Sequence, residues 1–128
     1  MKQILFALLL ALAVTLPALS AADMKETPIN ASSMLLPGSL SASQDFNIVV
    51  AGMYPNTCYT WGRADVTQPQ PFYYEVRLVA DLQQGRMCAM HLVPFQQSID
   101  LGQLQSGKNV VRLINADGTY IEESTNVN

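Results

Sequence analysis

Apolar and polar residues alternate with a period of two along most of the chain after residue 33. This alternation is typical of β-strands that bury one face. It is clearest in the segment 72–80, where Tyr74, Val76 and Leu78 share one face. The pattern predicts about seven strands, with Thr119–Ser124 as a possible eighth: Met34–Leu40, Phe46–Met53, Tyr59–Ala64, Phe72–Ala80, Arg86–Val93, Gln96–Leu101 and Asn109–Asn115.

Residues that favour turns separate these segments at the spacing of an all-β domain. The strongest signal is Asp117-Gly118, because this pair tolerates the positive φ angles of a tight hairpin. No stretch combines a helical period with a capping residue and a stop. The sequence therefore predicts an immunoglobulin-like antiparallel β-sandwich over residues 34–128, and a small closed barrel is the alternative.

The first residues have the pattern of a secretory leader. Lys2 precedes a run of 13 residues, Ile4–Leu16, that is apolar apart from Thr15, and Pro17 breaks the run before a set of small residues. The run is too short to span a bilayer and no second one follows it. We expect residues 1–22 to be a cleaved signal peptide, with an uncleaved anchor as the alternative, and residues 23–33 to be a flexible arm. Cleavage is compatible with three positions, Ser20, Ala21 and Ala22.

Export to an oxidising compartment would determine the redox state of the two cysteines. Cys58 and Cys88 are the only cysteines of the chain, and in an oxidising compartment an even count favours a disulfide. A ring of about 31 residues closed in this way stabilises the fold by about 3–4 kcal/mol in the loop-entropy model. Their spacing is not that of a CxxC redox or metal pair. We therefore predict one structural disulfide in a periplasmic or secreted protein.

Composition and charge narrow the class of partner. The 128 residues carry a formal charge of -3, which becomes -4 when the leader takes Lys2 away. A chain of this size fits one domain with a single core. Because it has no basic surface of the kind that nucleic acid requires, we expect no nucleic-acid partner, and no membrane span once the leader is removed.

The chain offers little for catalysis. His91 is its single histidine, and Ser-His-Asp or Cys-His chemistry needs a histidine held beside a nucleophile. No pair of acidic residues stands out as the acid and base of a glycosidase. We therefore expect a protein that is not an enzyme.

One metal hypothesis arises from Met87-Cys88-Ala89-Met90-His91, because thioether and imidazole groups suit Cu(I). Alternation in the predicted strand Arg86–Val93 places Met87 and His91 on one face and Met90 on the other. At most, Met87 and His91 would supply two ligands of a Cu(I) site, and Met24 or Met34 from the arm would supply another. The sequence favours packing over binding, and we expect no metal and no cofactor.

Several features after Cys58 invite a comparison. They are Cys88, Leu92-Val93-Pro94-Phe95, Leu101-Gly102-x-Leu104-x-x-Gly107 and Asn115-x-Asp117-Gly118. Together they resemble a loosely defined set of short exported bacterial proteins with immunoglobulin-like folds. The resemblance implies a β-sandwich and no catalytic residue.

A second, local resemblance lies in the segment Tyr54–Trp61. Pro55, Thr57, Tyr59 and Trp61 match the Asn-Pro-Thr-Thr-Gly-Tyr-x-Trp loop of chagasin-like cysteine-protease inhibitors, which insert loops of an immunoglobulin-like fold into a protease cleft. This resemblance implies protease inhibition. The other interpretation is a turn that leads into a strand, with Trp61 filling the core against the disulfide.

With catalysis and metal binding set aside, we expect this protein to bind a partner protein. Tyrosine is enriched where proteins meet, because it offers a large contact area with a polar group. We predict a non-catalytic exported binding or envelope-accessory protein that contacts a protein partner through turns or through an edge strand. The candidate contact residues are Tyr54, Asn56, Thr57, Tyr59, Gln68, Gln70, Phe72 and Tyr73.

Overall fold

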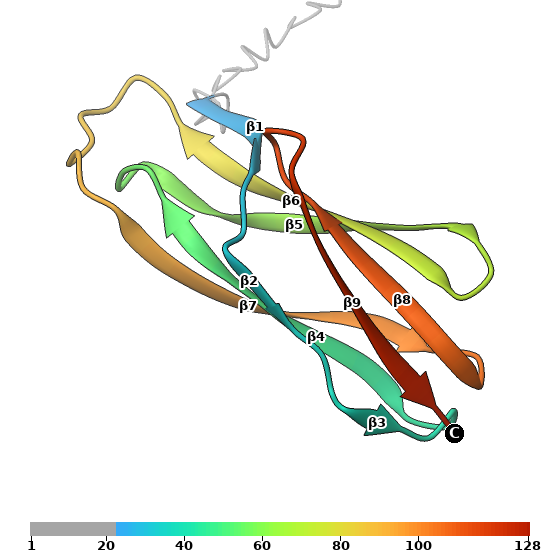
Figure 1. Ribbon diagram of the computed structural model, residues 1–128. Helices are drawn as coiled ribbons and strands as arrows, with labels where there is room; N and C mark the ends of the chain where they lie inside the picture. The colour runs from blue at the N-terminus through green and yellow to red at the C-terminus, as the bar shows by residue number, and fades with distance from the viewer. Residues whose placement is uncertain (1–22) are drawn as a thin grey trace, which may run out of the picture.

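A computed structural model describes residues 23–128 of the chain as two stacked β-sheets (Figure 1). The predicted signal peptide, residues 1–22, lies outside the described residues. Within residues 23–128 there is no α-helix, and so none that is long and apolar enough to cross a membrane. The strands are β1 (Met24–Ile29), β2 (Ser33–Leu35), β3 (Ser39–Leu40), β4 (Asp45–Tyr54), β5 (Tyr59–Gln70), β6 (Tyr73–Gln83), β7 (Val93–Gln103), β8 (Gly107–Ile114) and β9 (Tyr120–Val127).

Alternating apolar residues of three strands fill the space between the sheets. The side chains of Phe46, Ile48 and Val50 in β4 are completely buried, and those of Val76 in β6 and Leu113 in β8 are too. A strand turns successive side chains to opposite faces, so a period of two in the sequence becomes one buried face. The predicted all-β sandwich with one disulfide is confirmed.

Strand β6 organises the larger sheet. β5 pairs along one edge of β6, while β1 and β8 share the other edge, β1 beside Leu78–Gln83 and β8 beside Tyr73–Val76. β8 then pairs with β9, and β9 with the short β3. The β6–β8 and β3–β9 pairs are parallel, whereas the other strand pairs are antiparallel, as predicted.

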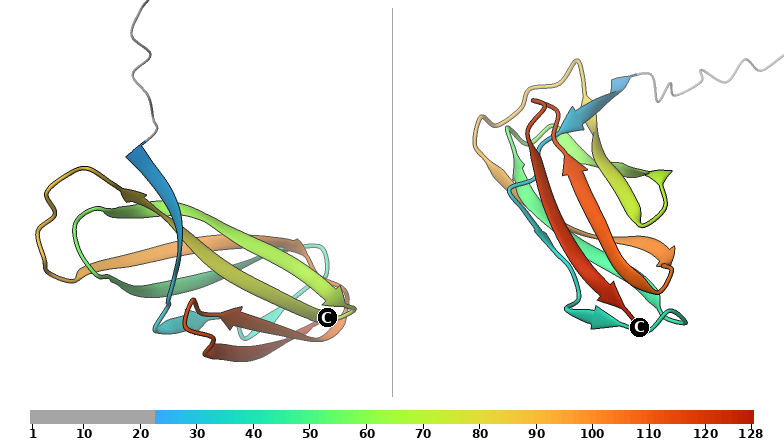
Figure 2. Two further views of the ribbon diagram at one scale, coloured as in Figure 1. Left: turned by 90° about the horizontal axis from the view of Figure 1, so that it is seen from above. Right: turned by 45° about the vertical axis from the view of Figure 1, so that its right-hand side comes forward.

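The smaller sheet has the order β2-β4-β7. After β1 the chain leaves the larger sheet at Asn30–Ser32 and enters the smaller one as β2, which closes one side of the sandwich (Figure 2). Within residues 23–128, the outer edges of β5 and β7 have no partner strand. Pro69 in β5 and Pro94 in β7 fit there, because an edge strand loses no ladder hydrogen bond to proline.

The segment expected to be a flexible arm, residues 23–33, is instead mostly strand. Its residues from Met24 to Ile29 form β1 and pair antiparallel with β6. Ile29 is the one buried side chain of β1. The strand therefore joins the sheet mainly through its backbone hydrogen bonds, although most of its side chains are polar or exposed. This prediction was wrong because burial by one residue leaves no periodic pattern.

The predicted strand Arg86–Val93 is also corrected. Residues 84–92 form a loop, and β7 begins only at Val93. Cys88, Met90 and Leu92 alternate in the sequence, but Met90 and Leu92 are exposed. The disulfide, and not a neighbouring strand, holds this segment. The expected strand Met34–Leu40 divides into β2 and β3 around Pro37-Gly38, and the expected strand Gln96–Leu101 lies within β7.

Candidate functional site

The predicted contact residues form two groups at opposite ends of β5. Tyr54, Asn56, Thr57 and Tyr59 lie where β4 turns into β5, and Gln68–Tyr73 form the hairpin to β6. A strand of this length spans about 36 Å, so the two groups belong to separate surfaces (Figure 1). We call the end that carries the turn Pro55–Cys58 the disulfide end.

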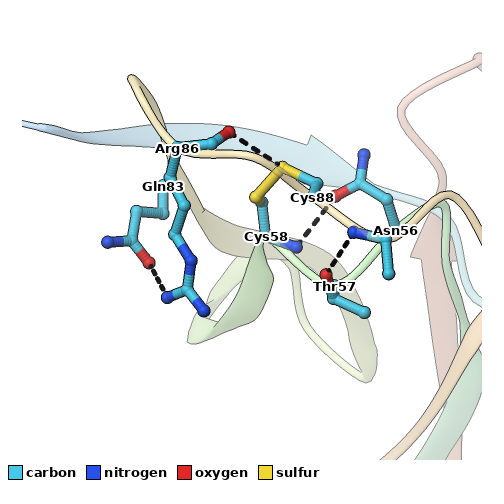
Figure 3. Close-up of a disulfide and its surroundings, with 7 residues drawn as sticks. Asn56, Thr57, Cys58, Gln83, Arg86 and Cys88 are labelled. Atoms are coloured by element: carbon cyan, nitrogen blue, oxygen red, sulfur yellow. Dashed lines mark hydrogen bonds between the residues drawn. A yellow bond between two sulfur atoms is a disulfide. The ribbon is translucent and has the colours of Figure 1, made fainter.

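The disulfide ties the β4–β5 turn to the loop after β6. Cys58 is buried at the start of β5, and its Cα lies 5.5 Å from that of Cys88 in the loop Gln84–Leu92 (Figure 3). The predicted Cys58–Cys88 disulfide is therefore present. In immunoglobulin domains the disulfide joins the two sheets through the core. Here it fastens a loop at the end of the sandwich.

Two predicted contact residues form hydrogen bonds here, Thr57 to this loop and Asn56 within the turn. The Thr57 backbone N–H donates to the Ala89 carbonyl oxygen at 3.2 Å, and the Ala89 N–H donates to Thr57 Oγ1 at 2.9 Å. The Asn56 side chain accepts a hydrogen bond from the Cys58 N–H at 2.9 Å. The polar groups of Asn56 and Thr57 are thus engaged in local structure, while Thr57 stays exposed.

Tyr54 belongs to the core. Its side chain is 5% exposed and stacks on Phe95 with ring centroids 4.6 Å apart and on Tyr59 at 6.0 Å. Burial raises the pKa of Tyr54, and its hydroxyl oxygen has no hydrogen-bond partner among the described residues. Trp61 is half-buried and tilts against Phe95. Of this aromatic group, Tyr59 is the predicted contact residue that also faces a surface hollow.

That hollow opens at the disulfide end and has a volume of about 140 Å³. Its wall is mostly apolar, and it combines residues of β1, β4, β5 and the β8–β9 hairpin. They are Pro28, Ile29, Asn30, Met53, Pro55, Tyr59 and Ala116. A cavity of about 150 Å³ holds one benzene ring, so the hollow has room for one apolar side chain.

Hydrogen bonds between the β8–β9 hairpin and the N-terminal segment fix one wall of the hollow. The Ala31 N–H donates to Asn115 Oδ1 at 2.9 Å, and the Asp117 N–H donates to Asn30 Oδ1 at 3.4 Å. The Thr119 hydroxyl and N–H both donate to Asp117 Oδ1, at 2.6 and 2.9 Å. These bonds hold the pKa of Asp117 below its ordinary value.

The far end of β5 presents the second group. Gln68 and Gln70 are exposed, and Phe72 is 39% exposed in a backbone conformation with φ of 63°. A positive φ is uncommon for an aromatic residue. The Phe72 carbonyl accepts a hydrogen bond from Val110 at 2.9 Å, which joins this hairpin to β8.

Tyr73 lies beside a cluster on the outer face of the larger sheet. The Arg112 guanidinium is 5.6 Å from the centre of the Tyr73 ring and 4.1 Å from that of Tyr120. It also forms an ion pair with Glu122 at 2.6 Å, whose hydrogen bond raises the pKa of Arg112. Desolvation raises the pKa of Tyr73. The Arg112 charge is thus already paired within the chain.

Neither surface contains a free cysteine among the described residues. Both cysteines are in the disulfide. Within residues 23–128, no group of three or more His, Cys, Asp or Glu side chains is placed to hold a metal ion. Sequence reasoning missed the hollow, because its wall residues come from four separate segments. It also discounted the exposed loop, whose methionines had been assigned to a strand.

Comparison with known proteins agrees with the fold. The family described as ORF11 beta-sandwich domain matches residues 48–127, which is more than half of the chain. The match begins within β4 and ends within β9, so it includes both cysteines and the loop between β6 and β7. No curated protein and no solved structure matches the chain.

Proposed function

The chain belongs to the ORF11 beta-sandwich domain family, whose description names a fold and no activity, and from the geometry we propose a non-catalytic binding protein. In this proposal the disulfide end recognises a protein partner, and the hollow beside Tyr59 accepts one apolar side chain of that partner. The hollow is the observation that carries the proposal. Protein interfaces concentrate their binding energy where an anchor side chain fills a pocket.

The rigidity of the hollow supports this proposal. The hydrogen bonds of Asn115 and Asp117 fix the hairpin wall, and the disulfide fixes the start of β5. A surface that is already ordered loses little conformational entropy when a partner binds.

Export is the second part of the proposal. It is supported by the leader pattern of residues 1–22, by the Cys58–Cys88 disulfide and by the resemblance to short exported bacterial proteins. The protein would then act in the periplasm or outside the cell as a binding or envelope-accessory protein. Sequencing the N-terminus of the protein from cell fractions tests this part, and cytoplasmic protein that retains Met1 would contradict it.

Site-specific crosslinking tests the hollow. A photoreactive residue in place of Met53, in the wall of the hollow, is expected to capture one protein partner in producing cells. The same residue in place of Lys108, at the far end of β8, is expected to capture none. Filling the hollow by Ala116→Phe should weaken the binding of the captured partner at least tenfold, because a pocket anchor contributes about 2 kcal/mol or more.

Ser98→Phe is the matched control for Ala116→Phe. Ser98 is exposed on the outer face of β7, away from the hollow, so an added ring there should leave binding unchanged. If Ala116→Phe binds as well as the original protein, or if the residue at position 108 captures the same partner, the hollow is not the contact surface.

A cysteine-protease inhibitor is the second candidate function. One observation favours it: the turn Pro55–Cys58, the loop Gln84–Leu92 and the hairpin between β8 and β9 lie at the same end of the molecule (Figure 1). A protein that inserts loops into a cleft needs them together. Micromolar inhibition of a papain-like protease, lost on Thr57→Ala with Tyr59→Ala and kept on Thr67→Ala, would support it. Without inhibition at that concentration the candidate fails.

A further inference from the structure

The loop Gln84–Leu92 exposes soft metal ligands to solvent. The Met87 and Met90 side chains are 96% and 82% exposed, and His91 beside them is exposed as well. By contrast, Met34 is 4% exposed in the core. The side chains of these two methionines therefore contribute little to the core.

The loop conformation does not separate the three side chains in the way that a strand would. Alternation along a strand would separate Met90 from Met87 and His91, but this segment is not a strand. From Met87 to His91 the backbone spans at most about 14 Å. Methionine is unbranched and has three rotatable bonds, so its sulfur atom can reach a point between the two ends of such a segment.

The middle of this segment is fixed. Cys88 is bonded to Cys58 (Figure 3), and Ala89 exchanges two hydrogen bonds with Thr57. Met87 and Met90 therefore extend from either side of an anchored dipeptide. Anchoring lowers the entropy lost when the side chains gather around a ligand.

The hydrogen bond of His91 prepares its ring for a metal ion. His91 Nδ1 lies 3.2 Å from the Leu92 carbonyl oxygen, which can only accept a hydrogen bond. In the neutral ring this contact places the proton on Nδ1 and leaves the lone pair of Nε2 available. Metal-binding histidines are commonly oriented in this way by a carbonyl group on the other nitrogen.

The ligand atoms of this loop, thioether sulfur and imidazole nitrogen, determine which metal ion it can bind. Residues 84–92 contain no Asp or Glu, so the loop lacks the oxygen ligands that Mg²⁺ and Ca²⁺ prefer. Its cysteine is held in the disulfide. Two thioethers and one imidazole are a soft set that selects Cu(I). We propose that Met87, Met90 and His91 form a Cu(I) site on the loop Gln84–Leu92.

Copper binding by the isolated, oxidised protein tests the proposal. Cu(I) is added with ascorbate, since a thiol reductant would also exchange with the disulfide. In competition with the chelator bicinchoninate, the protein is expected to retain one Cu(I) per chain. Met87→Leu, Met90→Leu and His91→Gln should each weaken binding at least about tenfold, since the loss of even an outer-shell partner of a metal ligand costs about that much.

Met53→Leu is the matched control, since Met53 is 55% exposed but lies on β4 outside the loop. Leucine keeps the apolar volume at all three methionines, and a free-thiol assay verifies that the disulfide is intact. Retention of less than one Cu(I) per chain would overturn the proposal. So would equal weakening by Met53→Leu and Met87→Leu. Because no partner protein is present, either result leaves the proposed function of the hollow unaffected.

Discussion

At the residue scale, the side chain of Asn115 pairs with the backbone groups of Ala31, which has no neighbouring strand within residues 23–128 to bond them. Its Oδ1 accepts a hydrogen bond from the Ala31 N–H at 2.9 Å, and its Nδ2 donates to the Ala31 carbonyl at 3.4 Å and to Thr119 Oγ1 at 3.1 Å. Ala31 is 6% exposed at the point where the chain changes sheets. Asn115→Ala leaves these backbone groups unpaired, and should lower the free energy of unfolding by about 1–3 kcal/mol in urea denaturation.

Asn47→Ala is the control for this prediction. Asn47 is exposed on β4, and its replacement should change the free energy of unfolding by less than about 0.5 kcal/mol. Equal losses in the two variants would mean that the side-chain bonds to Ala31 do not stabilise the switch between sheets.

Tyr54 illustrates what the sequence does and does not predict at this scale. The alternation Phe46, Ile48, Val50 and Gly52 predicts the buried face of β4, and one further step places Tyr54 in the core. We had instead predicted Tyr54 as a residue that contacts a partner. Gly52 leaves the space for the Phe95 ring, since a Cβ at Gly52 would lie 2.8 Å from that ring. This fit between two strands cannot be inferred from either strand alone.

At the scale of elements, the disulfide is what orders the loop Gln84–Leu92. The two hydrogen bonds to Thr57 each contribute about 1 kcal/mol, less than the disulfide. Reduction should therefore release the loop while the strands stay folded. Tryptic cleavage after Arg86, which is exposed in the loop, should accelerate at least about tenfold, as followed by mass spectrometry.

Cleavage after Lys108 provides the internal control. Lys108 lies in β8, whose backbone pairs with β9, so its cleavage rate should stay constant on reduction. If both sites accelerate equally, reduction unfolds the whole domain. If neither does, the loop is ordered without the disulfide.

The elements that the sequence misassigned share a physical cause. Alternation reveals a strand only when one of its faces is buried, as in β4, β6 and β8. β1 buries a single side chain, and β5 continues to Gln70 along a free edge, so neither shows a full pattern. The loop shows the opposite case, in which apolar residues alternate along a segment that pairs with no strand of the described chain. The parallel β6–β8 pair depends on contacts between distant segments that a local pattern does not contain.

At the scale of the whole molecule, the N-terminal strand completes the larger sheet. β1 covers the β6 edge at Leu78–Gln83 and buries Ile29, and it meets the start of the loop where the Gln84 N–H donates to the Asp23 carbonyl (Figure 2). A chain that begins at Asn30 should lose more than about 2 kcal/mol of stability, because Ile29 alone contributes about that much. Its uncovered β6 edge should also cause self-association, measured by light scattering.

A peptide of residues 23–32, added in trans, distinguishes a missing strand from general damage by truncation. Because β1 pairs through its backbone and one apolar side chain, this peptide should restore the monomer and the urea midpoint of the truncated chain. The same peptide with Ile29→Asp should restore neither, since it would bury a carboxylate in the core. If the truncated chain is already monomeric with an unchanged midpoint, or if both peptides act alike, β1 is not part of the stabilising sheet.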